Sequence, residues 1–293
     1  MGSLLLAVKS KMYIFAHRRA RGLLAGEYAA IFHGRSLDFD DLRTYVPGDE
    51  VRDIDWKATA RTGTPLIKRY VATRRQQLLF VTDTGRNMAA LARGGEPKKD
   101  LAVLAMGVLG ALAVAHGDSV SMIYGDGDLS QAFPAKGTEN HVEQLLRCVD
   151  GASTERGPSD LCARLEYAAV HYRQRVLLVV VADDVLASDR LAKVLRRLAA
   201  QHEILWIQLA DAALAGAGAL EGTALAAEEL DDVHLLLARD PALARSYADA
   251  VAARSNDLAR LLTSRGIAAA TIGTSDEVLT QVFALLERHR RAR

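Results

Sequence analysis

Acidic and basic side chains alternate over residues 35–61 of this 293-residue chain, and two kinds of chemistry suit such a pattern. The carboxylates could hold a metal ion for hydrolysis of a phosphodiester. They could instead form bidentate ion pairs with neighbouring arginines, which set loop geometry more reliably than they add stability. Because bases are interleaved with the acids, we favour ion pairing. The acids are Asp38, Asp40, Asp41, Asp49, Glu50, Asp53 and Asp55, and the bases are Arg35, Arg43, Arg52, Lys57 and Arg61.

The charged stretch contains a predicted tight turn at Pro47-Gly48-Asp49. Proline presets φ for such a turn, and glycine supplies the positive φ that a type II turn requires. We expect Asp49 and Glu50, which lie beside the turn, to face solvent. The stretch is then either a structural ion-pair network, which we favour, or a recognition surface.

An alternating pattern follows the turn. Asp53 and Asp55 share one face of an extended segment, and Ile54 and Trp56 share the other. This alternation predicts a half-buried strand, with Trp56 as a buried anchor of the motif.

The order of residues in this stretch resembles the signature of a bacterial family, domain of unknown function number 58. The resemblance implies a von Willebrand factor A-like domain, and members of that family are commonly encoded beside a MoxR-type AAA+ ATPase. The residues that carry it are Asp38, Asp40, Asp41, Arg43, Tyr45, Pro47, Gly48, Asp49, Arg52, Asp55, Trp56, Lys57 and Arg61.

Short apolar runs alternate with helical patterns along the rest of the chain, which predicts an α/β fold with a mostly parallel sheet and helices on both faces. We expect two regions: an N-terminal helix with an irregular, β-rich motif over residues 1–75, and a von Willebrand factor A-like, doubly wound domain over residues 76–293. Residues 211–240 fit a long loop or an inserted excursion. The expected strands are 66–71, 77–82, 119–124, 129–133, 176–181, 203–209 and 268–272, and the expected helices are 4–32, 100–116, 140–149, 160–172, 188–201, 241–265 and 275–290.

Three loops are expected to meet where strand order reverses, because ligands of open α/β sheets bind beyond the carboxyl ends of the strands there. These loops follow Thr82, surround Ser159 and follow Val181. In the family that the chain resembles, they form a metal-ion-dependent adhesion site with an Asp-x-Ser-x-Ser string, a threonine and a further aspartate. Here the string begins with Asp83, its serine positions hold Gly85 and Asn87, Ser159 takes the place of the threonine, and Asp183 or Asp184 is the third-loop aspartate.

The altered string predicts weak metal binding. One hydroxyl ligand is missing at Gly85, and Arg86 brings a cation that could pair with Asp83 or Asp183. We therefore expect Mg²⁺ to bind no better than millimolar. The alternative is that Asp83 caps the following helix or supports the loops.

Composition limits the partners and the compartment. The net charge of +1 and the pI of about 7.8 argue against bulk nucleic acid as a partner. Cys148 and Cys162 show neither a disulfide framework nor a metal spacing, which predicts a reducing, cytoplasmic location. The apolar run at 101–115 is shorter than the ~20 residues of a membrane span and is predicted to be a buried helix. The basic helix within 4–32 is expected to pack on the main domain, with a membrane-surface helix as the alternative.

No nucleophile, base or phosphate-binding string indicates catalysis, so no catalytic residue is assigned. The leading hypothesis is a non-enzymatic adaptor that engages a MoxR-type AAA+ ATPase and its client protein. The partner rests on the resemblance alone. The alternative is a metal-dependent hydrolase of phosphoester or nucleic-acid substrates that uses the carboxylates of residues 38–55.

Overall fold

The computed structural model describes residues 2–18, 35–46, 49, 54–73, 76–127, 129–152, 155–212, 237 and 239–291. The chain divides into two compact units. One comprises Met1–Ile31 and Gln77–Arg293, and the other comprises Phe32–Gln76. Each unit contains one sheet.

The larger unit is built on a six-stranded sheet with the order β5-β4-β3-β6-β7-β8. Neighbouring strands are parallel except for β4 and β5, which are antiparallel. The predicted α/β class with a mostly parallel sheet is therefore confirmed. The strands are β3 (Gln77–Thr82), β4 (Ser119–Asp126), β5 (Leu129–Lys136), β6 (Leu177–Ala182), β7 (Glu203–Leu209) and β8 (Ala268–Ile272).

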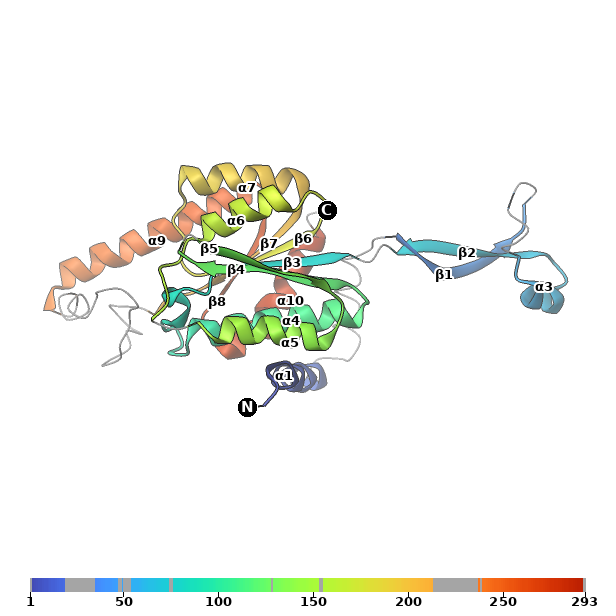
Figure 1. Ribbon diagram of the computed structural model, residues 1–293, viewed down its shortest axis with the longest axis horizontal. Coiled ribbons are helices and arrows are strands. Elements are labelled where there is room, and N and C mark those ends of the chain that lie inside the picture. The colour runs from blue at the N-terminus through green and yellow to red at the C-terminus, as the bar shows by residue number, and fades with distance from the viewer. Residues whose placement is uncertain are drawn as a thin grey trace. The chain divides into compact units, whose positions relative to one another are not determined.

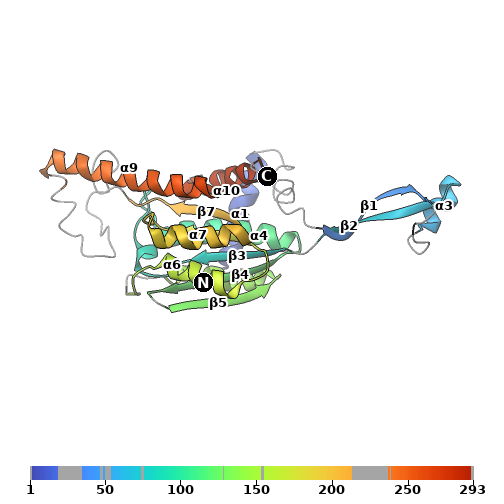
Figure 2. The same cartoon turned by 90° about the horizontal axis from the view of Figure 1, so that it is seen from above.

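Helices cover both faces of this sheet, as Figures 1 and 2 show. One face carries α4 (Lys98–Ala115), α5 (Glu139–Asp150) and α10 (Ser275–Arg291), and the other carries α6 (Leu161–His171), α7 (Asp189–Gln201) and α9 (Pro241–Ser264). The apolar run at 101–115 lies in α4 and is buried over most of its length, as predicted. Within the described residues, no helix has both the length and the apolar character needed to cross a bilayer.

The core lies on both sides of the central strands. Every residue of β6 is buried, and Trp206 of β7 is fully enclosed. Leu79 and Val81 of β3 pack with side chains of α6, α7 and α9. Parallel strands that are covered on both faces carry continuous apolar runs, which is why these strands could be located from the sequence.

Helix α1 (Leu4–Arg18) packs against α4 and α5. The carboxylate of Glu143, in α5, accepts hydrogen bonds from the amides of Leu4 and Leu5 at 3.1 and 2.8 Å. It thereby satisfies N–H groups that a helix start leaves without partners. The predicted packing of this helix on the main domain is confirmed for α1, which groups with the larger unit. The rest of the expected helix, residues 19–32, and most of 211–240 lie outside the described residues.

The smaller unit is a hairpin of β1 (Arg35–Thr44) and β2 (Leu66–Thr73), with the short helix α3 (Trp56–Thr62) between them in the chain. Over the described residues 54–56, the predicted strand is wrong. Ile54 forms a single bridge to Ile67, and Asp55 is the N-cap of α3. The Asp55 carboxylate accepts two backbone N–H groups, and the alanine-rich segment after it favours a helix over a strand.

The prediction that Trp56 is a buried anchor is also wrong. Trp56 is the first residue of α3, and 65% of it is exposed. In a strand its ring would have shared a face with Ile54. The helix that Asp55 caps directs it to solvent instead.

Candidate functional site

Loops from distant parts of the chain meet beyond the carboxyl ends of β3 and β6. Strand order reverses at β3, because β4 lies on one side of it and β6 on the other. The amide of Thr84 donates to the carbonyl of Gly125 at 2.8 Å, and the amide of Arg86 donates to the carbonyl of Gly157 at 3.0 Å. The predicted meeting of the loop after β3 with the loop around Ser159 is therefore confirmed.

Asp83 is the buried carboxylate of these loops, with 5% of its surface exposed. Burial raises its pKa to about 7, and the charges of Asp160 and Asp183 act in the same direction, while Arg164 opposes them. The Arg164 Nη1 lies 3.9 Å from the Asp83 Oδ1, which is too far for a hydrogen bond, so burial prevails. Arg164 is itself fully buried.

Polar atoms around Asp83 lack hydrogen-bond partners within the protein. The Oγ1 of Thr84, the Oδ1 of Asn87, the Oγ of Ser159 and the Oδ1 of Asp83 are buried and unsatisfied, as are the Nε and Nη1 of Arg164. Buried polar groups are normally satisfied by protein or ordered water. A set that contains both donors and acceptors suits water or the polar groups of a partner.

Gly85 occupies the position of the first serine in the string, and the structure leaves no space for a side chain there. A Cβ at this position would lie 2.7 Å from the carbonyl oxygen of Gly157 and 3.0 Å from the Oγ of Ser159. The close packing of the two loops therefore requires glycine at position 85, and glycine carries no hydroxyl ligand.

We expect Gly85→Ala to lower the free energy of unfolding by about 1 to 3 kcal/mol, because the added methyl group overpacks the loop contact. Urea denaturation measures this loss. Gly2→Ala is the matched control, because a Cβ at Gly2 meets nothing within 4 Å. Equal stability of the two variants would show that the loops have room for a serine.

The loop after β6 brings a second carboxylate, Asp183, whose Oδ1 lies 2.6 Å from the Nζ of Lys98. Lys98 also forms an ion pair with Asp211. Burial raises the pKa of Asp183 to about 6, although Lys98 opposes the shift. Asp184, the other candidate for the third-loop aspartate, pairs instead with Arg254 at 3.0 Å.

These residues do not fit a divalent cation. Arg164 lies beside Asp83 and Lys98 lies beside Asp183, and the sequence indicated neither of these two cations. Within the described residues, no group of three or more His, Cys, Asp or Glu side chains could hold a metal ion. Asp83 does not cap the following helix either, because that element, η2 (Arg86–Ala89), has Gly85 as its N-cap and no side-chain cap.

Sequence reasoning missed both Lys98 and Arg164, which lie far from these aspartates in the chain. One signal was present at Lys98. It is the first residue of α4, directly after Pro97, where the helix dipole disfavours a positive charge. Arg164 lies within an otherwise ordinary amphipathic pattern and carried no such signal.

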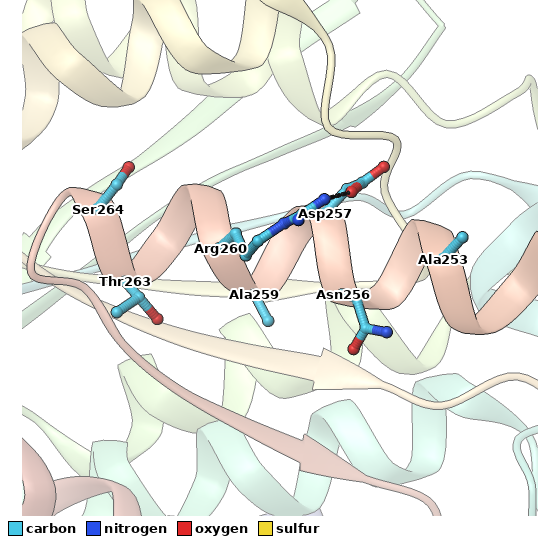
Figure 3. Close-up of a pocket in the computed structure, with 7 residues that line it drawn as sticks. All are labelled: Ala253, Asn256, Asp257, Ala259, Arg260, Thr263 and Ser264. Carbon is cyan, nitrogen blue, oxygen red and sulfur yellow. Dashed lines mark hydrogen bonds and ion pairs between the residues drawn. The ribbon is translucent and has the colours of Figure 1, made fainter.

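A pocket of about 380 Å³ adjoins these loops, and its lining includes Asp184, Asp211, Arg93, Tyr247 and Arg254. Both arginines are already paired, Arg254 with Asp184 and Arg93 with Glu277 at 2.9 Å. A hollow of about 770 Å³ lies along α9 (Figure 3), and all seven of its lining residues come from that one helix. We assign no chemistry to either space.

In the motif of the smaller unit, Arg43 and Asp49 form a bidentate pair with distances of 2.8 and 2.6 Å. The hydrogen bond from Arg43 lowers the pKa of Asp49, and the amide of Val46 contributes to the shift. The predicted bidentate pairing is confirmed for this pair. The prediction that Asp49 simply faces solvent is wrong, because Arg43 engages its carboxylate and only 20% of its side chain is exposed.

Some of the other motif residues are described by the structure, and the rest are not. Tyr45 donates its amide to Pro65, and Lys57 and Arg61 are exposed on α3. The predictions for the remaining positions stay predictions. The side chains of Asp38, Asp40 and Asp41, and the residues Pro47, Gly48, Glu50, Arg52 and Asp53, lie outside the described part of the chain.

Comparison with known proteins gave both relatives and similar structures. The family model "Protein of unknown function DUF58" matches residues 41–257. Uncharacterized protein Mb1516 of Mycobacterium bovis and Uncharacterized protein Rv1480 of Mycobacterium tuberculosis are each 27% identical over 278 residues, which cover 92% of this chain and 85% of each relative.

Two similar solved structures are a von Willebrand factor type A protein from Catenulispora acidiphila and the conserved hypothetical protein BatB from Bacteroides thetaiotaomicron. The first has a TM-score of 0.43 and 8% identity, and the match covers 75% of this chain and 44% of that chain. The second has a TM-score of 0.41 and 12% identity, and the match covers 74% of this chain and 99% of that chain.

The sheet and its loops define an α/β protein with a doubly wound, mostly parallel sheet and a polar loop cluster where strand order reverses. Because the family model covers more than half of the chain, the protein belongs to the DUF58 family. The resemblance seen in residues 38–61 is thereby confirmed.

Proposed function

We propose that this protein is a non-enzymatic interaction module, an adaptor that works with a MoxR-type AAA+ ATPase in the assembly or maturation of a client protein. One observation carries the proposal. Trp56, in the unit that bears the family motif, exposes 65% of its surface. Tryptophan is highly buried on average, and it is among the residues most enriched at binding hot spots.

The surroundings of Trp56 in α3 suit a partner with acidic and apolar groups. Lys57 and Arg61 are both exposed and stand four residues apart, so they lie on one face of the short helix that Trp56 begins. Charged residues at the edge of an interface increase the association rate and the specificity for a partner. A central aromatic residue contributes much of the binding free energy.

Two carboxylates of the motif are engaged within the motif itself. Asp49 is paired with Arg43, and Asp55 caps α3. This use supports an adaptor over the alternative hydrolase, which would need those carboxylates for a metal. We place the adaptor in the cytoplasm, where an AAA+ ATPase has ATP, and assign it no nucleic-acid partner.

The test mixes the purified chain with the MoxR-type ATPase encoded in the same genome and follows complex formation by size-exclusion chromatography, with and without ATP. Co-elution supports the proposal, and separate elution in every nucleotide state contradicts it. In parallel, the chain is incubated with generic phosphodiester substrates and Mg²⁺ or Mn²⁺. Turnover that Asp40→Ala abolishes would replace the adaptor with the hydrolase.

A further inference from the structure

Lys98 lies where a positive charge is unfavourable on two counts. It is the first residue of α4, at the positive end of the helix dipole. Its side chain is only 2% exposed, and a buried charge is costly unless it is paired and hydrogen-bonded. The reason that a lysine is tolerated at this position therefore lies in the groups that pair with its ammonium.

Those partners come from two neighbouring strands. Asp183 directly follows β6 and hydrogen-bonds to the Lys98 Nζ at 2.6 Å, and Asp211 follows β7 and pairs with the same nitrogen. Burial alone would lower the pKa of Lys98, but the two carboxylates outweigh it and hold the pKa above its ordinary value. One ammonium group thus ties two loops to the start of α4.

The carboxylate of Asp83 also has a buried cation beside it. Arg164, from α6, lies beside Asp83 and donates a hydrogen bond to the carbonyl of Gly127. The packing of Gly85 leaves no room for a hydroxyl ligand next to Asp83. Each carboxylate that would face a divalent cation therefore has a protein cation beside it, and that charge would repel the metal.

We propose that the Lys98 ammonium is a built-in counter-ion that holds the loops after β6 and β7 in the place of a divalent cation, and that removing its charge opens a cation site formed by Asp183 and Asp211. A divalent cation can replace the ammonium group because both bind the same kind of ligand. Both an ammonium group and Mg²⁺ or Ca²⁺ are satisfied by carboxylate oxygens, and Mg²⁺ needs only one or two carboxylates because it keeps several waters. The loops of the wild-type chain then keep their arrangement without metal.

The test compares melting temperatures of the wild-type chain and Lys98→Met, in EDTA and in about 5 mM Mg²⁺ or Ca²⁺. Methionine keeps most of the length of the lysine stem and removes its charge. We expect the wild-type melting temperature to change by less than about 1 °C, and that of Lys98→Met to fall in EDTA and to recover by about 3 °C or more with metal. Lys98→Met with Asp183→Asn should lose that recovery.

Lys99→Met is the matched control, because Lys99 is the next residue of the same helix and donates to the backbone carbonyls of Asp150 and Ala152. It should gain no response to metal. If Lys98→Met folds but neither Mg²⁺ nor Ca²⁺ raises its melting temperature, the proposal is overturned. A wild-type chain that Mg²⁺ stabilises would also overturn it, and that result decides the matter even if Lys98→Met does not fold.

Discussion

Replacing Arg164 with alanine is expected to lower the free energy of unfolding by about 3 to 5 kcal/mol at pH 8, because it leaves Asp83 as a buried charge without a counter-charge. The side chain of Arg164 is fully buried, and its Nη1 lies 3.9 Å from the Asp83 carboxylate. At pH 5 the loss should be smaller, because Asp83 can take up a proton instead. Urea denaturation at the two pH values measures both effects.

Two further variants make the Arg164 result specific. Arg164→Met combined with Asp83→Asn removes both charges and should recover much of the lost stability, since a buried ion pair can often be exchanged for neutral groups. Arg197→Ala removes an exposed arginine of α7 and should change stability by less than about 0.5 kcal/mol. A loss of the same small size in Arg164→Ala would contradict the buried pairing.

The contribution of Asp83 to the stability of the wild-type chain should fall as the pH rises from about 4 to about 7, and Asp83→Asn should remove that contribution. Asp83 has a folded pKa of about 7, against an ordinary value of 3.8. Between these values the folded state keeps a proton that the unfolded state has lost, so stability declines by up to about 1.4 kcal/mol per pH unit. Above pH 7 both states are ionised, and the decline from this group ends.

Asp83→Asn also leaves the buried Arg164 without its counter-charge, so the expected effect is on the slope of stability with pH and not on the absolute stability at pH 8. Urea denaturation between pH 4 and pH 8 gives the slope. The control is Asp249→Asn, which removes an exposed carboxylate of α9 and should leave the slope unchanged. A pH profile of Asp83→Asn parallel to that of the wild type would contradict the raised pKa of Asp83.

The sheet could be predicted from the sequence because its signals are local. Residues 78–81 and 204–207 are continuous apolar runs, which is typical of a parallel strand covered on both faces. The meeting of the loops around Asp83 and Ser159 follows from that topology, since the carboxyl ends of parallel strands share one edge.

The contents of the site could not be predicted in the same way. The pairs formed by Lys98 with Asp183 and by Arg164 with Asp83 join residues far apart in the chain, and no local pattern encodes such a pairing. Trp56 was misjudged for a different reason. Its alternation with Ile54 fits a strand, but Asp55 caps a helix at that point, and a short apolar alternation cannot separate the two.

The dissociation constant of the MoxR-type ATPase for the wild-type chain and for Trp56→Ala, measured by isothermal titration calorimetry, tests the proposed function most directly. The account predicts that Trp56→Ala keeps the wild-type melting temperature, because the ring is exposed, and binds about 30-fold more weakly, as expected for loss of a hot-spot residue. Leu129→Ala, which truncates an exposed apolar side chain of the larger unit, should bind as the wild type does. Equal affinity of Trp56→Ala and the wild type would contradict the claim that this residue is the anchor of the interaction.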